Sequence, residues 1–148
     1  MTFQFRKASQ QDADAIAVLF RRTREHSMPY LPPLHSIGDD KSYFNNIVLA
    51  QDIVWVAESG GDILGFCAFR DQWLDHLYVD PKHQRLGIGS ALLGIVTKQN
   101  RVLNLWVFQR NTAAIHFYER HRFILIRKTD GHENEEKEPD ALYRRGSP

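Results

Sequence analysis

Hydrophobic residues recur along the chain with two different spacings. The first residues alternate between polar and apolar, as in a strand, whereas Ile16, Leu19 and Phe20 fall on one side of a helix. The two spacings predict, in chain order, a strand at 3–5, a helix from a Ser9–Asp12 capping box to Arg24, a helix capped by Asp39 and running to Val48, strands over 53–57, 63–69 and 73–79, a helix over 88–96, a strand over 102–107, a helix over 111–121, a strand over 123–127 and an edge strand over 141–143.

Loops separate these elements at recognisable breaks. Residues 28–35 contain three prolines, which fix φ and remove N–H donors, so we expect an ordered loop there. Glycines within 59–62 predict a hairpin turn, and residues 130–138 are almost entirely polar. The element order β-α-α-β-β-β-α-β-α-β-β implies a mixed α/β sheet with helices on its faces. We expect one domain over residues 1–145, followed by a short tail at 146–148.

Composition narrows the function classes. The chain has 148 residues and a formal net charge of +1, which gives no general attraction to nucleic acid or to a membrane. Its single cysteine, Cys67, excludes an internal disulfide framework and lies in an apolar run, so we expect a small buried side chain. The seven histidines show no metal-ligand spacing. The first residues lack the apolar core of a signal peptide, and no apolar run has transmembrane length, so we expect a cytoplasmic protein.

The segment Gln84-Arg85-Leu86-Gly87-Ile88-Gly89-Ser90 predicts an anion cradle. It follows a predicted strand and opens an amphipathic helix. The first N–H groups of a helix lack intrahelical partners, and the helix dipole adds partial positive charge there. Glycines let a phosphate approach the backbone closely, although they also suit a plain turn or close helix–sheet packing. The cradle therefore predicts a phosphate-bearing ligand.

The details of this segment decide between known phosphate loops. A P-loop requires a lysine after its last glycine, but Ser90-Ala91 follows here. A dinucleotide fingerprint requires a third glycine, and that position is Leu92. Instead, Gln84, Gly87 and Gly89 match the signature Gln/Arg-x-x-Gly-x-Gly/Ala, so the segment resembles the pyrophosphate loop of the GNAT superfamily of acyl-CoA N-acyltransferases.

Two further segments resemble the same family, in its order and spacing. Residues 74–81 resemble its central strand and the following turn, and residues 107–119, with an Asn-x-x-Ala…Phe-Tyr pattern, resemble its second cofactor-contacting strand and helix. The resemblance covers about residues 1–145. It implies a single-domain fold with a mostly antiparallel sheet flanked by about four helices, and the transfer of an acetyl group from acetyl-CoA to a primary amine in a ternary complex.

The resemblance also implies roles for particular residues. The backbone of Leu77 and Val79 would pair with the pantetheine arm, and the Leu77 N–H would donate to the oxyanion. Tyr118 would protonate the leaving thiolate, and Asn111 would reach the CoA arm. The pyrophosphate would bind backbone N–H groups of Arg85, Leu86, Gly87, Ile88, Gly89 and Ser90.

Structural roles compete with some of these assignments. Asn111 suits a helix N-cap whatever the function, and a tyrosine at position 118, among apolar neighbours, suits core packing. The general base is open: Asp75 ranks first, with His76 or a water path as alternatives, the two side chains being expected on opposite faces of the strand. Arg122 stands where the family usually has a glycine in the αL conformation, which leaves the local helix end open.

The acceptor amine is not encoded in any motif. The family's variable parts correspond to residues 30–35 and 130–140, which are expected to form the acceptor pocket for a small-molecule or peptide amine. Tyr30 and His35 either line this pocket or belong to a proline-rich loop that only closes the fold. The polar residues Asn134, Glu135, Glu136 and Glu138 either attract a cationic amine or form a solvated charged turn, and the solvated turn is preferred. A homodimer is compatible with the family. The alternatives from other classes are a non-catalytic acyl-CoA-binding sensor and a nucleotide-binding regulatory domain.

Overall fold

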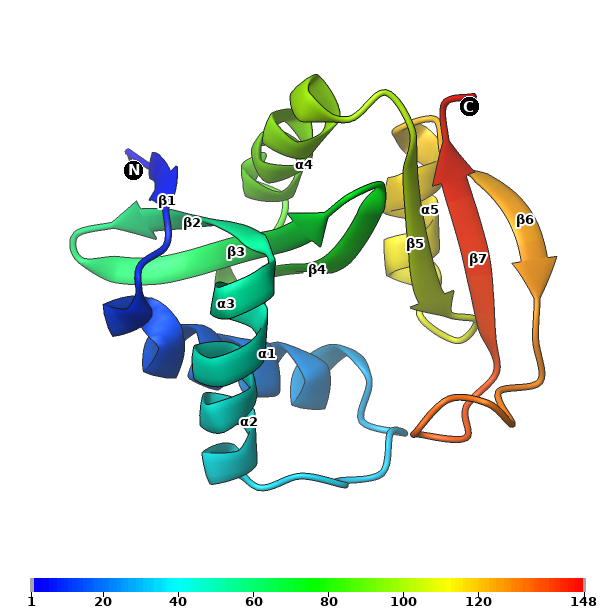
Figure 1. The fold of residues 1–148 in the computed structure, drawn as a ribbon, viewed down its shortest axis with the longest axis horizontal. Coiled ribbons are helices and arrows are strands. Elements are labelled where there is room, and N and C mark those ends of the chain that lie inside the picture. The colour runs from blue at the N-terminus through cyan, green and yellow to red at the C-terminus, as the bar shows by residue number, and fades with distance from the viewer. Residues whose placement is uncertain (1, 148) are drawn as a thin grey trace.

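The computed structural model describes residues 2–147 and contains a seven-stranded mixed sheet in the order β1-β2-β3-β4-β5-β7-β6 (Figure 1). All neighbouring strands are antiparallel except β4 and β5, which are parallel. The elements are β1 (Gln4–Lys7), α1 (Ala13–Ser27), α2 (Ile37–Tyr43), a π-helical segment (Phe44–Val48), α3 (Leu49–Gln51), β2 (Ile53–Ser59), β3 (Asp62–Arg70), β4 (Trp73–Val79), α4 (Ile88–Gln99), β5 (Leu103–Phe108), α5 (Thr112–Arg120), β6 (Ile124–Lys128) and β7 (Asp140–Arg145), with 3₁₀ turns at Gln10–Asp12 and Pro81–His83.

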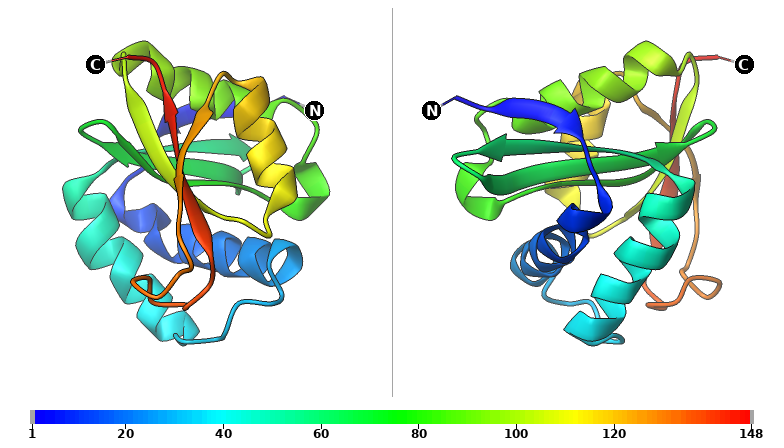
Figure 2. Two further views of the ribbon diagram at one scale, coloured as in Figure 1. Left: turned by 90° about the vertical axis from the view of Figure 1, so that its right-hand side faces the viewer. Right: turned by 60° about the vertical axis from the view of Figure 1, so that its left-hand side comes forward.

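Helices cover both faces of the sheet. Figure 2 shows α4 on one face of strands β1–β4 and the α1 and α2 helices on the other, while α5 packs beside β5. One apolar cluster joins the sheet to α4 and α5, and a second, containing Phe44 and Phe66, joins it to α1 and α2. The predicted α/β fold, with a mostly antiparallel sheet and about four flanking helices, is confirmed. The predicted burial of Cys67 is also confirmed, and desolvation raises the pKa of its thiol to about 12.

Two predicted details were wrong. Ser36, rather than Asp39, caps the second helix: the Ser36 side chain accepts from the Asp39 N–H at 3.1 Å, and the Asp39 carboxylate accepts from the Ser36 N–H. The last strand is not at the sheet edge, because β7 inserts between β5 and β6 and leaves β6 outermost. Arg122 does keep the αL conformation at the end of α5, with φ 72°.

Two irregularities in β4 shape the centre of the sheet. A register shift opposite Ala68 and Phe69 leaves Asp75 as an extra residue, which is a β-bulge. On the other side, β4 and β5 pair only at Trp73 and Asn104. The two parallel strands therefore separate beyond Trp73, and the last part of β4 has an open edge.

Candidate functional site

The open edge of β4 presents backbone groups from alternate residues. The Asp80 N–H donates to the Leu64 carbonyl of β3 at 2.8 Å, so it points away from the gap. Since successive residues of a strand direct their N–H groups to opposite edges, those of Leu77 and Val79 point toward the gap between β4 and β5. This edge can accept an extended ligand as an added strand.

The glycine segment lies at the end of this edge and starts α4. Gly87 is the N-cap with φ 85°, and Arg85 also has a positive φ of 67°. The first helical bond of α4 runs from the Ala91 N–H to the Gly87 carbonyl, so earlier N–H groups remain available. A Cβ at Gly89 would lie 3.4 Å from the Phe117 ring. The concave backbone and free donors suit a pyrophosphate group.

Tyr118 lies on α5 in the same apolar cluster as Leu77 and Val79. Its ring is 5.4 Å from that of Phe123, and its side chain is 9% exposed. Desolvation is the main cause that raises the pKa of its hydroxyl far above the ordinary value. Tyr118 therefore combines core packing with a hydroxyl that stays protonated, as a general acid requires.

Asn111 is the N-cap of α5, which was the structural role predicted for it beside contact with the CoA arm. Its Oδ1 accepts from the Ala114 N–H at 3.4 Å, and its Nδ2 lies 3.5 Å from the Met28 sulfur. A thioether is a weak acceptor, so a better acceptor can replace Met28 at this amide.

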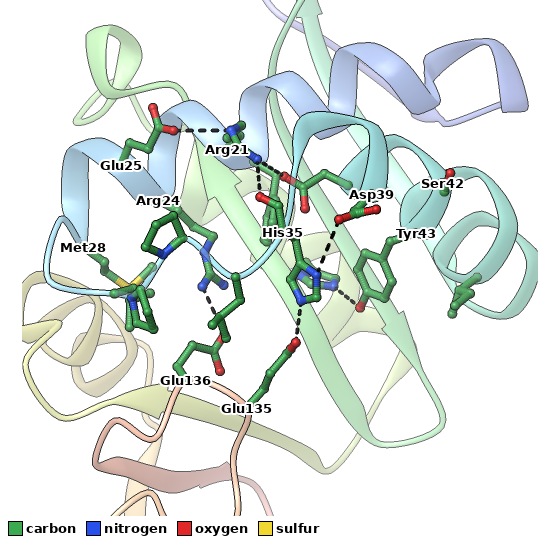
Figure 3. Close-up of a pocket in the computed structure, with 18 of the residues that line it drawn as sticks. Arg21, Arg24, Glu25, Met28, His35, Asp39, Ser42, Tyr43, Glu135 and Glu136 are labelled. Atoms are coloured by element: carbon green, nitrogen blue, oxygen red, sulfur yellow. Dashed lines mark hydrogen bonds and ion pairs between the residues drawn. The ribbon is translucent and has the colours of Figure 1, made fainter.

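A cavity of about 980 Å³ opens beside β4, between the α1–α2 loop, α2 and the β6–β7 loop (Figure 3). The proline-rich loop supplies the apolar walls, which are Met28, Pro29, Leu31, Pro32, Pro33 and Leu34. Of the two expected pocket residues, His35 lines the cavity and Tyr30 is not among its lining residues. The charged lining contains five carboxylates and two guanidinium groups: Glu25, Asp39, Asp40, Glu135 and Glu136, with Arg21 and Arg24.

The acidic β6–β7 loop is more ordered than the preferred solvated turn. Glu136 is 15% exposed and pairs with Arg24 at 3.0 Å. Glu135 lies 2.5 Å from His35 Nε2 across the cavity, as Figure 3 shows. Glu138 is buried and makes two hydrogen bonds to Arg110. These contacts fix the loop against the cavity, which the sequence preference for a solvated turn did not anticipate.

His76 lines the cavity within a cage of aromatic rings. Its Nε2 lies 3.0 Å from the Tyr43 hydroxyl, and the rings of Phe20, Phe44 and Phe66 surround it. Burial lowers the pKa of His76 to about 4, and burial is also the main cause that raises the pKa of Tyr43 to about 12. Both groups are therefore neutral at ordinary pH.

Asp75 and His76 do not point to opposite faces, because the bulge at Asp75 interrupts the alternation of β4. Asp75 lies 3.7 Å from Arg70, which also lies 3.6 Å from the buried Asp52. After burial, Asp75 and Asp52 are the next causes that raise the pKa of Tyr43, so both carboxyl groups lie near this residue of α2. Asp52 and Arg70 were missed from the sequence, where each ends an element without a distinguishing motif.

Two negative findings apply to the described residues. Residues 2–147 contain no cluster of three or more His, Cys, Asp or Glu side chains that could hold a metal ion. Within the same range, no helix is both long enough and apolar enough to cross a membrane.

Known proteins resemble this chain in sequence and in fold. The family model of the acetyltransferase (GNAT) domain matches residues 50–125. Peptidyl-lysine N-acetyltransferase YiaC of Escherichia coli is 30% identical over 122 residues, covering 82% of this chain and 83% of that protein. Apo YjaB from Escherichia coli superposes with a TM-score of 0.81 at 18% identity, covering 99% and 100%. The acetyl-CoA complex of YncA, a putative acetyltransferase from Salmonella typhimurium, has a TM-score of 0.75 at 17% identity, covering 99% and 94%.

The family model spans about half of the chain, and the bacterial relative extends the match over most of it. The chain therefore belongs to the GNAT family and is an acyl-CoA-dependent N-acetyltransferase.

Proposed function

We propose that the chain transfers an acetyl group from acetyl-CoA to the side-chain amine of a lysine in a peptide or protein. The observation that carries this proposal is the open edge of β4, which ends at the glycine cradle and has Tyr118 in the same cluster. A pantetheine arm would pair with Leu77 and Val79, and the N–H groups of residues 85–90 would bind the pyrophosphate. Asn111 would exchange its Met28 contact for the CoA arm.

The proposed reaction has no covalent enzyme intermediate. The amine nitrogen forms a bond to the thioester carbonyl carbon, and the Leu77 N–H donates to the developing oxyanion. The carbon–sulfur bond then breaks, and the Tyr118 hydroxyl gives its proton to the thiolate. Holding amine and thioester together at the β4 edge would supply much of the rate enhancement.

The charge of the cavity favours a cationic acceptor. Its lining contains five carboxylates and two guanidinium groups, an excess of three carboxylates. Glu135 and Asp39 keep 58% and 63% of their side chains exposed, so both can meet an incoming ammonium group. The name of the YiaC relative, a peptidyl-lysine acetyltransferase, supports a lysine side chain as this cation. A cavity of about 980 Å³ has room for flanking peptide residues.

An ammonium group must lose a proton before it attacks, and Asp75 is the proposed acceptor. Burial first, and Asp75 second, raise the pKa of the neighbouring Asp52 to about 7, so Asp52 is charged above that pH and would then favour transfer of the amine proton to Asp75. His76, which follows Asp75 in β4, and Tyr43 line the cavity and would orient the amine or a water that carries its proton to Asp75.

Calorimetric titration of CoA, followed by turnover assays with acetyl-CoA and lysine peptides, tests the proposal. Micromolar CoA binding and acetylation of the lysine amine are expected. Gly89→Glu places a carboxylate beside the cradle and should abolish binding in a folded protein. Binding without turnover over a broad amine panel would favour the non-catalytic sensor, and failure of the folded wild type to bind CoA would contradict the proposal.

A further inference from the structure

His121 joins the end of α5 to the first turn of α4. Its Nδ1 lies 2.8 Å from the Phe117 carbonyl oxygen, and its Nε2 lies 3.1 Å from Ser90 Oγ. The His121 and Phe117 rings pack with their centroids 4.4 Å apart, and Phe117 also contacts the position of a Gly89 Cβ. The imidazole is therefore held in one orientation beside the glycine cradle.

These two contacts fix the direction of each hydrogen bond. A backbone carbonyl can only accept, so Nδ1 of His121 must carry a proton and donate to Phe117. In a neutral imidazole, Nε2 then has no proton and accepts from the Ser90 hydroxyl. The proton of Ser90 is thus directed at His121, and only the lone pairs of Oγ remain for any other partner.

A bound phosphate needs the opposite arrangement. Ser90 is the third residue of α4, and side chains in a first turn tilt toward the helix N-terminus, where an anion binds. Lone pairs repel an anion, whereas an O–H proton binds it. If His121 is protonated, Nε2 donates to Ser90 Oγ, and the Ser90 proton is free to donate to the phosphate. We propose that His121 controls the hydrogen-bond direction of Ser90, so that CoA binding is coupled to proton uptake by this imidazole.

The surrounding charges favour this coupling. Arg145 of β7 donates to the His121 carbonyl oxygen at 3.2 Å, and Arg120 and Arg122 flank His121 in the chain. Arg85 precedes α4 and belongs to the cradle itself. The acidic residue in the last turn of α5 is Glu119. A pyrophosphate bound in the cradle would place negative charge among these guanidinium groups and would favour a protonated imidazole in the complex.

The inference rests on the proposed CoA site, and calorimetry can separate the two. CoA is titrated at pH 7.5 in two buffers with different ionisation enthalpies, which gives the number of protons taken up. Dephospho-CoA is titrated in parallel, because the 3′-phosphate of CoA has its own pKa near 6. The wild type should take up a fraction of a proton with both ligands. His121→Gln should lose this uptake, whereas His116→Gln, at an exposed position of the same helix, should retain it.

Ser90→Ala keeps the imidazole and provides a second readout. Its CoA affinity should fall about tenfold at pH 6.5, because a hydrogen bond to a charged group is lost, and the fall should be smaller at pH 8.5. Equal proton uptake by the wild type and a folded His121→Gln would overturn the inference and leave the CoA site intact. If His121→Gln does not fold, a pH-independent effect of Ser90→Ala overturns it instead. Absence of CoA binding by the wild type would instead contradict the proposed function.

Discussion

Arg70 Nε lies 3.6 Å from Oδ1 of Asp52, a carboxyl group whose side chain is only 1% exposed. Neither oxygen of Asp52 has a hydrogen-bond donor among residues 2–147. Asp75 lies 3.7 Å from the same Nε, so one guanidinium group forms ion pairs with two carboxyl groups. Burial first, and Asp75 second, raise the pKa of Asp52 to about 7. Asp52 therefore carries its proton below about pH 7 and a negative charge above it.

This pair should make stability depend on pH. The folded protein holds the Asp52 proton up to about pH 7, whereas an unfolded aspartic acid loses it near 3.8, so folding stability falls as pH rises between these values. Asp52→Asn removes the charge and should stabilise the protein above pH 7, by up to about 4 kcal/mol. Urea unfolding at pH 5 and pH 8 measures the difference. Asp62→Asn, at an exposed hairpin position, serves as the control. An equal effect of the two variants at pH 8 would contradict the prediction.

The same pair should govern activity if Asp75 accepts the proton of the amine. Deprotonation of Asp52 adds a negative charge beside Asp75 and favours transfer of the amine proton to Asp75, so kcat/KM should rise as the pH passes about 7, where Asp52 titrates. Asp75→Asn should lower kcat at least tenfold and remove this rise, leaving only the increase caused by deprotonation of the substrate. Rates from pH 5.5 to 9 with one lysine peptide test this. An unchanged profile in Asp75→Asn would assign the proton to another acceptor.

Tyr118→Phe separates the chemistry of the hydroxyl from the packing of the ring. The ring contact with Phe123 remains in the variant, so stability should change by no more than about 1 kcal/mol. Loss of a general acid should reduce kcat by about 10²-fold with little change in CoA affinity. Since burial raises the pKa of Tyr118, no alkaline fall in rate from its ionisation is expected below pH 9. A wild-type kcat in Tyr118→Phe would exclude the general-acid role.

Glu135 and Glu133 form a matched pair for testing the acceptor charge. Both lie on the β6–β7 loop with exposed side chains, but only Glu135 lines the cavity. Glu135→Gln should raise KM for a lysine peptide about two- to fivefold, the range expected of an exposed charge interaction, while Glu133→Gln should not. A neutral amine of similar size should show no difference. Equal KM values for the lysine peptide in the two variants would indicate that Glu135 does not attract the substrate.

Local patterns predicted most of the fold because they act over a few residues. The glycines of the cradle, the Asn111 cap and the apolar runs each reflect a short-range requirement of the backbone. The Ser36 cap is equally local, since Ser36 stands three residues before Asp39, although the predicted cap was Asp39. A capping-box search at that spacing would have found it.

The rest depended on contacts between distant segments. The bulge at Asp75 arises from pairing with β3, and the meeting of Asp52 with Asp75 requires the end of α3 to lie against β4. The contact of His35 with Glu135 joins residues one hundred positions apart. Neither spacing nor composition encodes such pairings, so the acceptor side of the site was less predictable than the cofactor side.

Gly87 provides a test of the cradle in which backbone strain can be separated from ligand binding. Its φ is 85°, and a Cβ would meet nothing within 4 Å, so substitution strains only the backbone. Gly87→Ala should destabilise the protein by about 1–2 kcal/mol, and Gly87→Asn by less, because asparagine adopts αL more readily. Both add a Cβ next to the proposed pyrophosphate position, so both should weaken CoA binding, as measured by calorimetry beside urea unfolding. If Gly87→Ala has both the lower stability and the lower CoA affinity of the two variants, the left-handed backbone conformation at this position is what CoA binding requires. Equal loss of affinity despite unequal stability would show that close approach of the phosphate to the backbone is the requirement.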